Sequence, residues 1–137
     1  MKKHGISTYI VLFVILVTLM GSLIEAGAYE YKSSDENSVR VGIIPEQLAP
    51  GKQAKFNIKM NTHSVELNQD MAAVSILKDD KGHEYRPIRW DGSPPGGHHR
   101  SGVLEFPGIG KGAKSVTLYV KDIANVPERI FEWKIER

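Results

Sequence analysis

The chain has 137 residues, a formal net charge of +2 and no cysteine. A single small domain is expected at this length. Without thiols there is no disulfide framework, no lipid-modified cysteine and no thiolate for a blue-copper centre. Without the first 28 residues, 16 basic and 15 acidic residues remain, and this balance gives no electrostatic argument for nucleic-acid binding.

Residues 1–28 have the pattern of a signal peptide. Two lysines precede an apolar stretch from Tyr9 to Val17, and Ala26-Gly27-Ala28 supplies small residues for a signal peptidase. We expect cleavage before Tyr29. The alternative is a hydrophobic helix over residues 6–24 that stays as a membrane anchor, since a bilayer span needs about 20 residues. In both cases the folded part is expected outside the cytoplasm, secreted, periplasmic or on the outer face of a membrane.

Residues 29–38 are almost all polar and predict a tether. A β-sandwich domain is expected over 39–137, because apolar and polar residues alternate from Val39 with the period of two that half-buried strands show. Pro87 marks its fourth strand as an edge strand. Strands are expected at 39–43, 54–60, 71–77, 83–90, 102–106, 115–120 and 131–136. About seven short strands with frequent turn signals are typical of an all-β antiparallel sandwich.

Strand parity places the connections between these strands. If each strand reverses the chain direction, alternate loops lie at the same end of the sandwich. Loops 61–70, 91–101 and 121–128 then share one end, whereas loops 45–52, 79–82 and 107–113 share the other. This arrangement predicts that His63, His98 and His99 lie close together, with His83 near the opposite end.

These three histidines are candidate metal ligands. Neutral imidazole is the commonest protein ligand for metals, and neither Zn(II) nor Cu(II) needs a thiolate. His98 and His99 would point to opposite faces of an extended strand, so His63 with one of them is the firmer pair. Additional ligands are available nearby. Oxygen ligands could come from Glu66, Asp70, Asp91 and Asp122, and thioethers from Met60 and Met71, although core packing is expected for both methionines.

A purely structural interpretation is also open. His63 would then lock a loop by hydrogen bonds, and His98 and His99 would be polar residues of an exposed turn. Trp90 is expected to cap the sandwich end with its indole N–H on a loop carbonyl. Arg100 is expected to form a surface ion pair with Asp70 or Asp91. No set of nucleophile, base and orienting residue is recognisable, so an enzyme is not expected.

Several short motifs of the chain resemble a pattern in small, uncharacterised exported proteins of bacteria and archaea. They are Thr62-His63-Ser64-x-x-Leu67, Trp90-x-Gly92, Gly97-His98-His99-x-x-Gly102-x-Leu104-x-Phe106-Pro107 and Ile130-Phe131-x-Trp133. The resemblance implies an exported domain and no particular activity. The layout also resembles immunoglobulin-like and cupredoxin-like sandwiches, but the cysteine ligand of cupredoxins is missing here, and a fold analogy alone implies no function.

Together these patterns predict an exported β-sandwich that binds Cu or Zn through loop histidines. It would serve as a metal carrier, sensor or accessory domain. The alternative is a structural or interaction module of the cell envelope, in which the histidine-containing loops lock the fold and present a surface to a protein partner.

Overall fold

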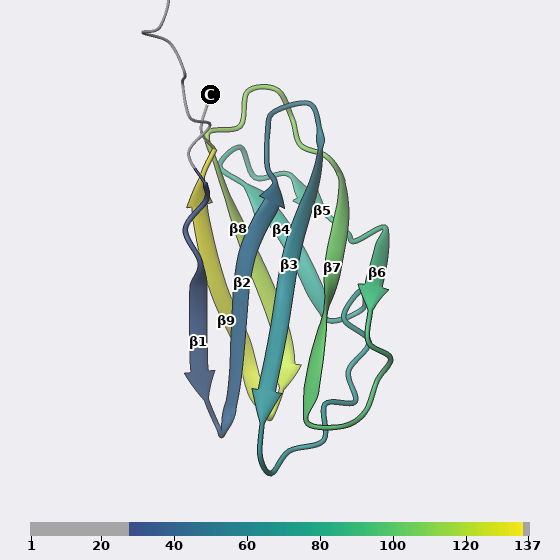
Figure 1. Cartoon of the computed structure of the whole chain (residues 1–137). Coiled ribbons are helices and arrows are strands. Elements are labelled where there is room, and N and C mark those ends of the chain that lie inside the picture. Colours follow the sequence, from purple (N-terminus) through teal and green to yellow (C-terminus); the bar gives the residue numbers. More distant parts are fainter. Residues whose placement is uncertain (1–27, 136–137) are drawn as a thin grey trace, which may run out of the picture.

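The computed structural model describes residues 28–135, which form two antiparallel sheets packed face to face (Figure 1). The all-β sandwich predicted from the sequence is confirmed, with nine strands in the described residues instead of about seven. No helix within residues 28–135 is long and apolar enough to cross a membrane. The expected signal peptide or anchor lies outside the described residues.

The strands are β1 (Lys32–Glu36), β2 (Val39–Gln47), β3 (Gln53–Thr62), β4 (Ser75–Asp79), β5 (Glu84–Tyr85), β6 (Arg89–Gly92), β7 (His99–Gly108), β8 (Ser115–Ile123) and β9 (Val126–Lys134).

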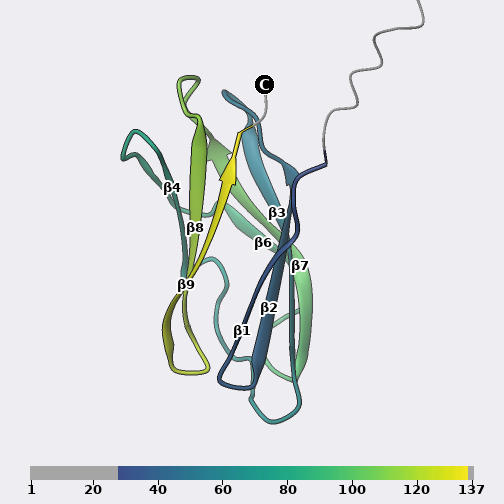
Figure 2. The same ribbon diagram turned by 90° about the vertical axis from the view of Figure 1, so that its left-hand side faces the viewer.

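The five-stranded sheet has the order β1-β2-β3-β7-β6, and the four-stranded sheet has the order β5-β4-β8-β9. The chain changes sheets three times in the described residues, between β3 and β4, between β5 and β6, and between β7 and β8. Figure 2 shows the two layers from the side, with β1 and β9 at the edge that faces the viewer. The inner face of each sheet therefore carries the apolar residues of the period-two pattern.

The core is built from those inward-facing residues. Phe56 packs edge-on against Phe106 at 5.8 Å between ring centroids and lies 5.3 Å from Trp133. Both sheets thus contribute aromatic rings to one cluster. The alternation of apolar and polar residues predicts burial of nine side chains in these strands, and eight of them are buried: Phe56, Ile58, Ile76, Leu104, Val116, Leu118, Phe131 and Trp133. The ninth, Val74, is only half-buried, because it lies in a turn that precedes β4.

Residues 29–38 are part of the sandwich, which corrects the expectation of a polar tether. Residues 32–36 form β1 and pair with β2 along their whole length. The Trp133 indole N–H donates to the Glu30 carbonyl at 2.7 Å, and the Tyr29 hydroxyl donates to the Leu48 carbonyl. The alternation rule missed β1 because this edge strand has no apolar residue, and distant side chains hold it in place.

Two other expected strands have different bounds in the structure. The strand expected at 71–77 begins only at Ser75, because the Asp70 side chain accepts the Ala72 amide at 3.0 Å and its carbonyl accepts the Val74 amide at 3.0 Å. These bonds hold a turn. The strand expected at 83–90 is divided around Pro87 into β5 and β6, which lie at the edges of different sheets.

The parity prediction for the loops is confirmed. At one end the Leu67 amide donates to the Gly97 carbonyl at 3.0 Å, and the Gln69 side chain donates to the Asp122 carbonyl at 3.2 Å. At the other end the Gly51 amide donates to the Ile109 carbonyl at 2.7 Å. Loops that are far apart in the sequence are therefore neighbours at each end.

Replacing Trp133 by alanine should lower the free energy of unfolding by about 3–5 kcal/mol, as large core truncations do. The indole is 3% exposed and packs between Phe56 and Phe131. Ile130→Ala on the same strand is the control, because Ile130 is 58% exposed, and its effect should stay within about 0.5 kcal/mol. Urea denaturation of the two variants measures both values. A Trp133→Ala effect as small as that of Ile130→Ala would contradict the core described above.

Candidate functional site

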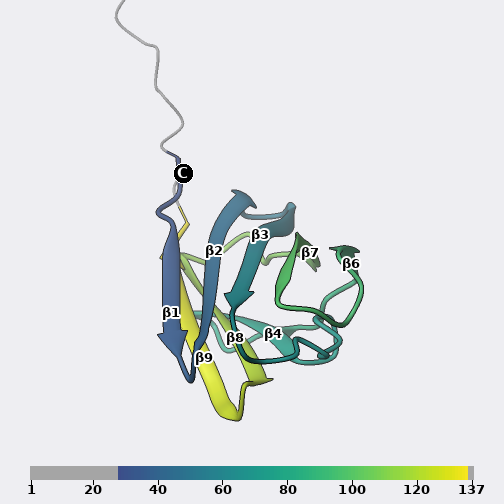
Figure 3. The same cartoon turned by 60° about the horizontal axis from the view of Figure 1, so that its bottom comes forward.

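The histidine end is the end of the sandwich formed by turn 37–38, segment 62–74, loop 93–98 and turn 124–125. Figure 3 brings this end forward and shows the β1–β2 and β8–β9 hairpins next to each other. The Asn37 side-chain amide donates to the Ala124 carbonyl at 3.0 Å and so links the two sheets. Both central residues of each turn have positive φ, as type I′ hairpins require. The sequence did not reveal these turns because neither contains glycine.

Backbone hydrogen bonds join segment 62–74 to loop 93–98. The Thr62 amide donates to the His98 carbonyl at 3.0 Å, and the Gly96 amide donates to the Leu67 carbonyl at 2.8 Å. The Gly97 amide donates to the Glu66 carboxylate at 3.0 Å. Gly96 and Gly97 have φ values of 116° and 75°, a region that favours glycine. The two segments therefore form one continuous hydrogen-bonded unit.

Arg100 is buried beneath this unit, with 3% of the residue exposed. Its Nη1 donates to the carbonyls of Leu67 at 2.9 Å and Gln69 at 2.7 Å, and Nη2 donates to the Ser93 carbonyl at 3.2 Å. Burial lowers the pKa of Arg100, and Asp70 partly opposes this shift. The expected surface ion pair with Asp70 or Asp91 is therefore wrong. Position 100 faces inward in the strand alternation of β7, so its guanidinium reaches loop carbonyls instead.

Trp90 caps this part of the sandwich as predicted, and its indole N–H donates to the Ser93 carbonyl at 2.9 Å. Gly92 and Gly102 lie opposite each other in β6 and β7. A Cβ atom on Gly92 would approach the Gly102 Cα to 2.5 Å and the Trp90 ring to 2.8 Å. Glycine is therefore required at both positions if the strands and the indole are to pack this closely.

A second arginine, Arg129 of β9, is 1% exposed and joins the two sheets at the same end. Its Nη1 donates to the Ser34 hydroxyl at 2.9 Å and the Val39 carbonyl at 3.2 Å, and Nη2 donates to the Glu36 carbonyl at 2.9 Å. Burial lowers the pKa of Arg129, while the charges of Glu36 and Asp35 oppose the shift. Sequence reasoning missed this residue because an arginine beside Glu128 is typical of a solvated turn.

The predicted histidines share one end of the sandwich, but their rings have different environments. The His99 Nδ1 lies 2.9 Å from the Asn61 side-chain oxygen. His63 and His98 are exposed. His83 lies at the opposite end, where its ring bonds Asp79. Within residues 28–135, no group of three or more His, Cys, Asp or Glu side chains is arranged to hold a metal ion. A site of all three imidazoles therefore stays a prediction.

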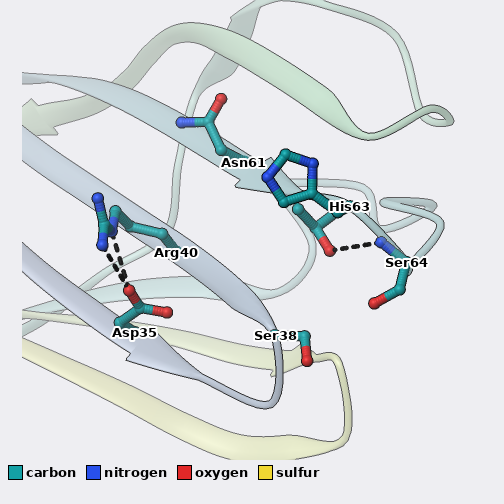
Figure 4. Close-up of a pocket in the computed structure, with 7 residues that line it drawn as sticks. Asp35, Ser38, Arg40, Asn61, His63 and Ser64 are labelled. Atoms are coloured by element: carbon teal, nitrogen blue, oxygen red, sulfur yellow. Dashed lines mark hydrogen bonds and ion pairs between the residues drawn. The ribbon is translucent and has the colours of Figure 1, made fainter.

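His63 borders a hollow of about 500 Å³ on the outer side of the five-stranded sheet (Figure 4). Its floor is a row of directly paired residues from three strands, Asp35, Arg40 and Asn61. Arg40 donates to one Asp35 oxygen through Nε at 3.0 Å and Nη2 at 2.7 Å. The wall consists of Ser38, Thr62, His63 and Ser64. The hollow therefore offers several polar groups that are held in fixed positions.

Comparison of this chain with protein-family models, with curated proteins and with solved structures found no match.

Arg100→Met should lower the free energy of unfolding by at least about 2 kcal/mol, because three loop carbonyls lose a buried donor. Arg40→Met is the matched control, since the Arg40 side chain is 62% exposed. Its effect should stay within about 1 kcal/mol. Urea denaturation compares the two. If both variants change the free energy of unfolding by the same small amount, the Arg100 guanidinium has no structural role.

The Asp79 cluster at the opposite end predicts acid sensitivity. Burial alone would raise the pKa of Asp79, but hydrogen bonds from the Tyr85 hydroxyl, the His83 amide and ring, and the Lys81 amide lower it from 3.8 to about 2. Because the pKa is depressed in the folded protein, this stabilisation is complete above pH 3.8 and disappears as the pH falls through about 2. The free energy of unfolding, measured between pH 5 and pH 2, should therefore decrease as Asp79 becomes protonated. In Asp79→Asn the decrease in stability between pH 5 and pH 2 that comes from this carboxylate should be absent. An unchanged decrease in the variant would contradict its assignment to Asp79.

Proposed function

We propose that the chain is an exported interaction module of the cell envelope, and that its histidine end presents a rigid polar surface to a partner. One observation carries the proposal. Segment 62–74 and loop 93–98 are bonded to each other and to Arg100, so the surface they form is ordered before a partner arrives. Such preorganisation lowers the entropic cost of binding.

The location outside the cytoplasm is proposed from residues 1–28, whose pattern is that of a signal peptide or, if uncleaved, of an anchor over residues 6–24. An immunoglobulin-like or cupredoxin-like relationship is likewise a proposal, supported by two packed antiparallel sheets whose chain alternates between them. A partner-binding domain of this kind needs no catalytic group, and we propose none.

Binding to fractionated cell envelope of the native host tests the module. The immobilised protein should retain a component of the wall, membrane or soluble envelope fraction. Ser64→Arg and His98→Glu, which change exposed positions of the histidine end, should weaken retention about tenfold or more. His83→Ala at the opposite end is the control. Equal retention by all variants, or retention of no component by the wild type, would contradict the proposal.

Transition-metal binding is the second candidate, supported by the environment of His99. The Asn61 side-chain oxygen can only accept, so Nδ1 of His99 carries the proton and Nε2 remains a metal-binding atom. The bond between the Thr62 amide and the His98 carbonyl places His63 and His98 on adjacent segments. We propose on these grounds that Cu(II) or Zn(II) binds through His63 with His98 or His99, in a carrier, sensor or accessory role.

Calorimetric titration with Cu(II) and Zn(II) should then show one ion per chain and a metal-dependent rise in the unfolding temperature. Binding should weaken in acid, because ligand imidazoles must be deprotonated. His63→Ala should weaken binding strongly, whereas His83→Ala should not. Comparing His98→Ala with His99→Ala shows which neighbour is the second ligand. If no metal shifts the stability of the wild type, the metal hypothesis is wrong.

A further inference from the structure

We infer that the partner of this module is an uncharged polysaccharide chain, which lies on the outer face of the five-stranded sheet and extends from Tyr31 to His63 at the histidine end. The inference rests on the proposed interaction function and names the chemical class of the partner. Four features of that face support the inference. They are two adjoining hollows, an aromatic ring that packs on β2, hydrogen-bond donors and acceptors that remain available, and balanced charge.

Two hollows follow each other along β2 and β3. The first, of about 500 Å³, is bordered by Arg40 and Asn61. The second, of about 190 Å³, is bordered by Gly42 and Lys59, the next outward-facing positions on the same strands, and also by Tyr31. Two residues of a strand span about 7 Å. Neighbouring sugar units of an extended chain could therefore occupy the two hollows, one unit in each.

Tyr31 supplies an exposed aromatic surface in this line. A Cβ atom on Gly42 would come within 1.9 Å of the Tyr31 hydroxyl oxygen and 2.6 Å of its ring, so the phenol rests on β2 only because position 42 is glycine. The residue remains 53% exposed. A tyrosine ring held in this way combines an apolar body with a polar tip. It can therefore pack against the C–H groups of a sugar ring while its hydroxyl bonds a sugar oxygen.

The polar side chains of the first hollow match neighbouring hydroxyl groups. The hydrogen bonds between Arg40 and Asp35 use Nε, Nη2 and a single carboxylate oxygen. Nη1 of Arg40 and the second Asp35 oxygen take no part in these two bonds and remain available as a donor and an acceptor. A sugar hydroxyl both donates and accepts, so the hydroxyls of a sugar can bond to both groups. The ion pair already orders both side chains, which lowers the entropic cost of binding.

The charges of the outer face balance each other. Lys55 pairs with Glu105 at 3.5 Å, and Arg89 pairs with the same carboxylate at 2.9 Å. The outward-facing positions of these strands carry four basic residues (Arg40, Lys55, Lys59 and Arg89) and four acidic residues (Asp35, Glu46, Asp91 and Glu105). An anionic polymer would gain little on a face without net charge. An uncharged partner with many hydroxyl groups fits both the charge and the donors of the surface.

Affinity electrophoresis of the purified full-length protein tests the inference. The gels contain a β-1,3-glucan, a β-1,4-glucan, a galactomannan or neutral wall polysaccharide from the native host, and polygalacturonate serves as the anionic comparison. At least one uncharged polymer should retard the wild type. Tyr31→Ala should weaken binding about tenfold or more, since it removes both the apolar ring face and the hydroxyl that contact the sugar. Gly42→Ala should do the same, because it displaces the ring without removing it.

Tyr119→Ala is the matched control, since Tyr119 is a half-buried tyrosine in β8 of the four-stranded sheet. Its binding should equal that of the wild type, and thermal unfolding confirms that each variant is folded. Absence of retardation by every uncharged polymer overturns the inference, as does retardation by polygalacturonate alone or equal binding by Tyr31→Ala. If an envelope protein instead binds and the histidine-end variants alone disrupt it, the proposed function survives and the polysaccharide inference fails.

Discussion

Two buried guanidinium groups, those of Arg100 and Arg129, hold one end of the sandwich together. Loops that close the end of a sandwich carry backbone carbonyls that packing removes from water, and each needs a donor. An arginine fork supplies several donors in one rigid group. Arg100 bonds three carbonyls, and Arg129 bonds three carbonyls and a hydroxyl. Among the described residues neither arginine forms an ion pair, so the hydrogen bonds, together with the nearby charges of Asp70, Glu36 and Asp35, offset the cost of burying the two charges.

The candidate surface depends on both arginines, although neither lies on it. Arg129 fixes β1 and turn 37–38, which place Asp35 and Ser38 on one side of the hollow. Arg100 fixes segment 62–74, which carries His63 on the other side. Binding groups on loops are useful only when a rigid scaffold positions them. The buried charges therefore connect the stability of the fold to the order of its surface, and this connection is why we place the function at this end.

Sequence periodicity predicted most of the fold, because inward-facing apolar residues are what packs the two sheets. The alternation in β2, β3, β7, β8 and β9 identified these strands, and parity then brought His63 near His98. β1 could not be predicted this way, since it has no apolar residue and its contact with the other sheet comes from Arg129, more than 90 positions away. Arg100 also escaped prediction, because average burial places arginine at the surface. The directions of the histidine rings depend on hydrogen bonds such as that of Asn61 to His99, which no local pattern encodes.

Amide hydrogen exchange measured by NMR tests most directly whether Arg100 locks the histidine end. In the wild type, the amides of Thr62, Leu67 and Gly96 should be protected, because each donates to a carbonyl across the two segments. In Arg100→Met their protection should fall about tenfold or more beyond any global loss of stability, while amides in β8 and β9 follow the global stability. Rapid exchange of the three amides in the wild type, or unchanged protection in the variant, would contradict the account.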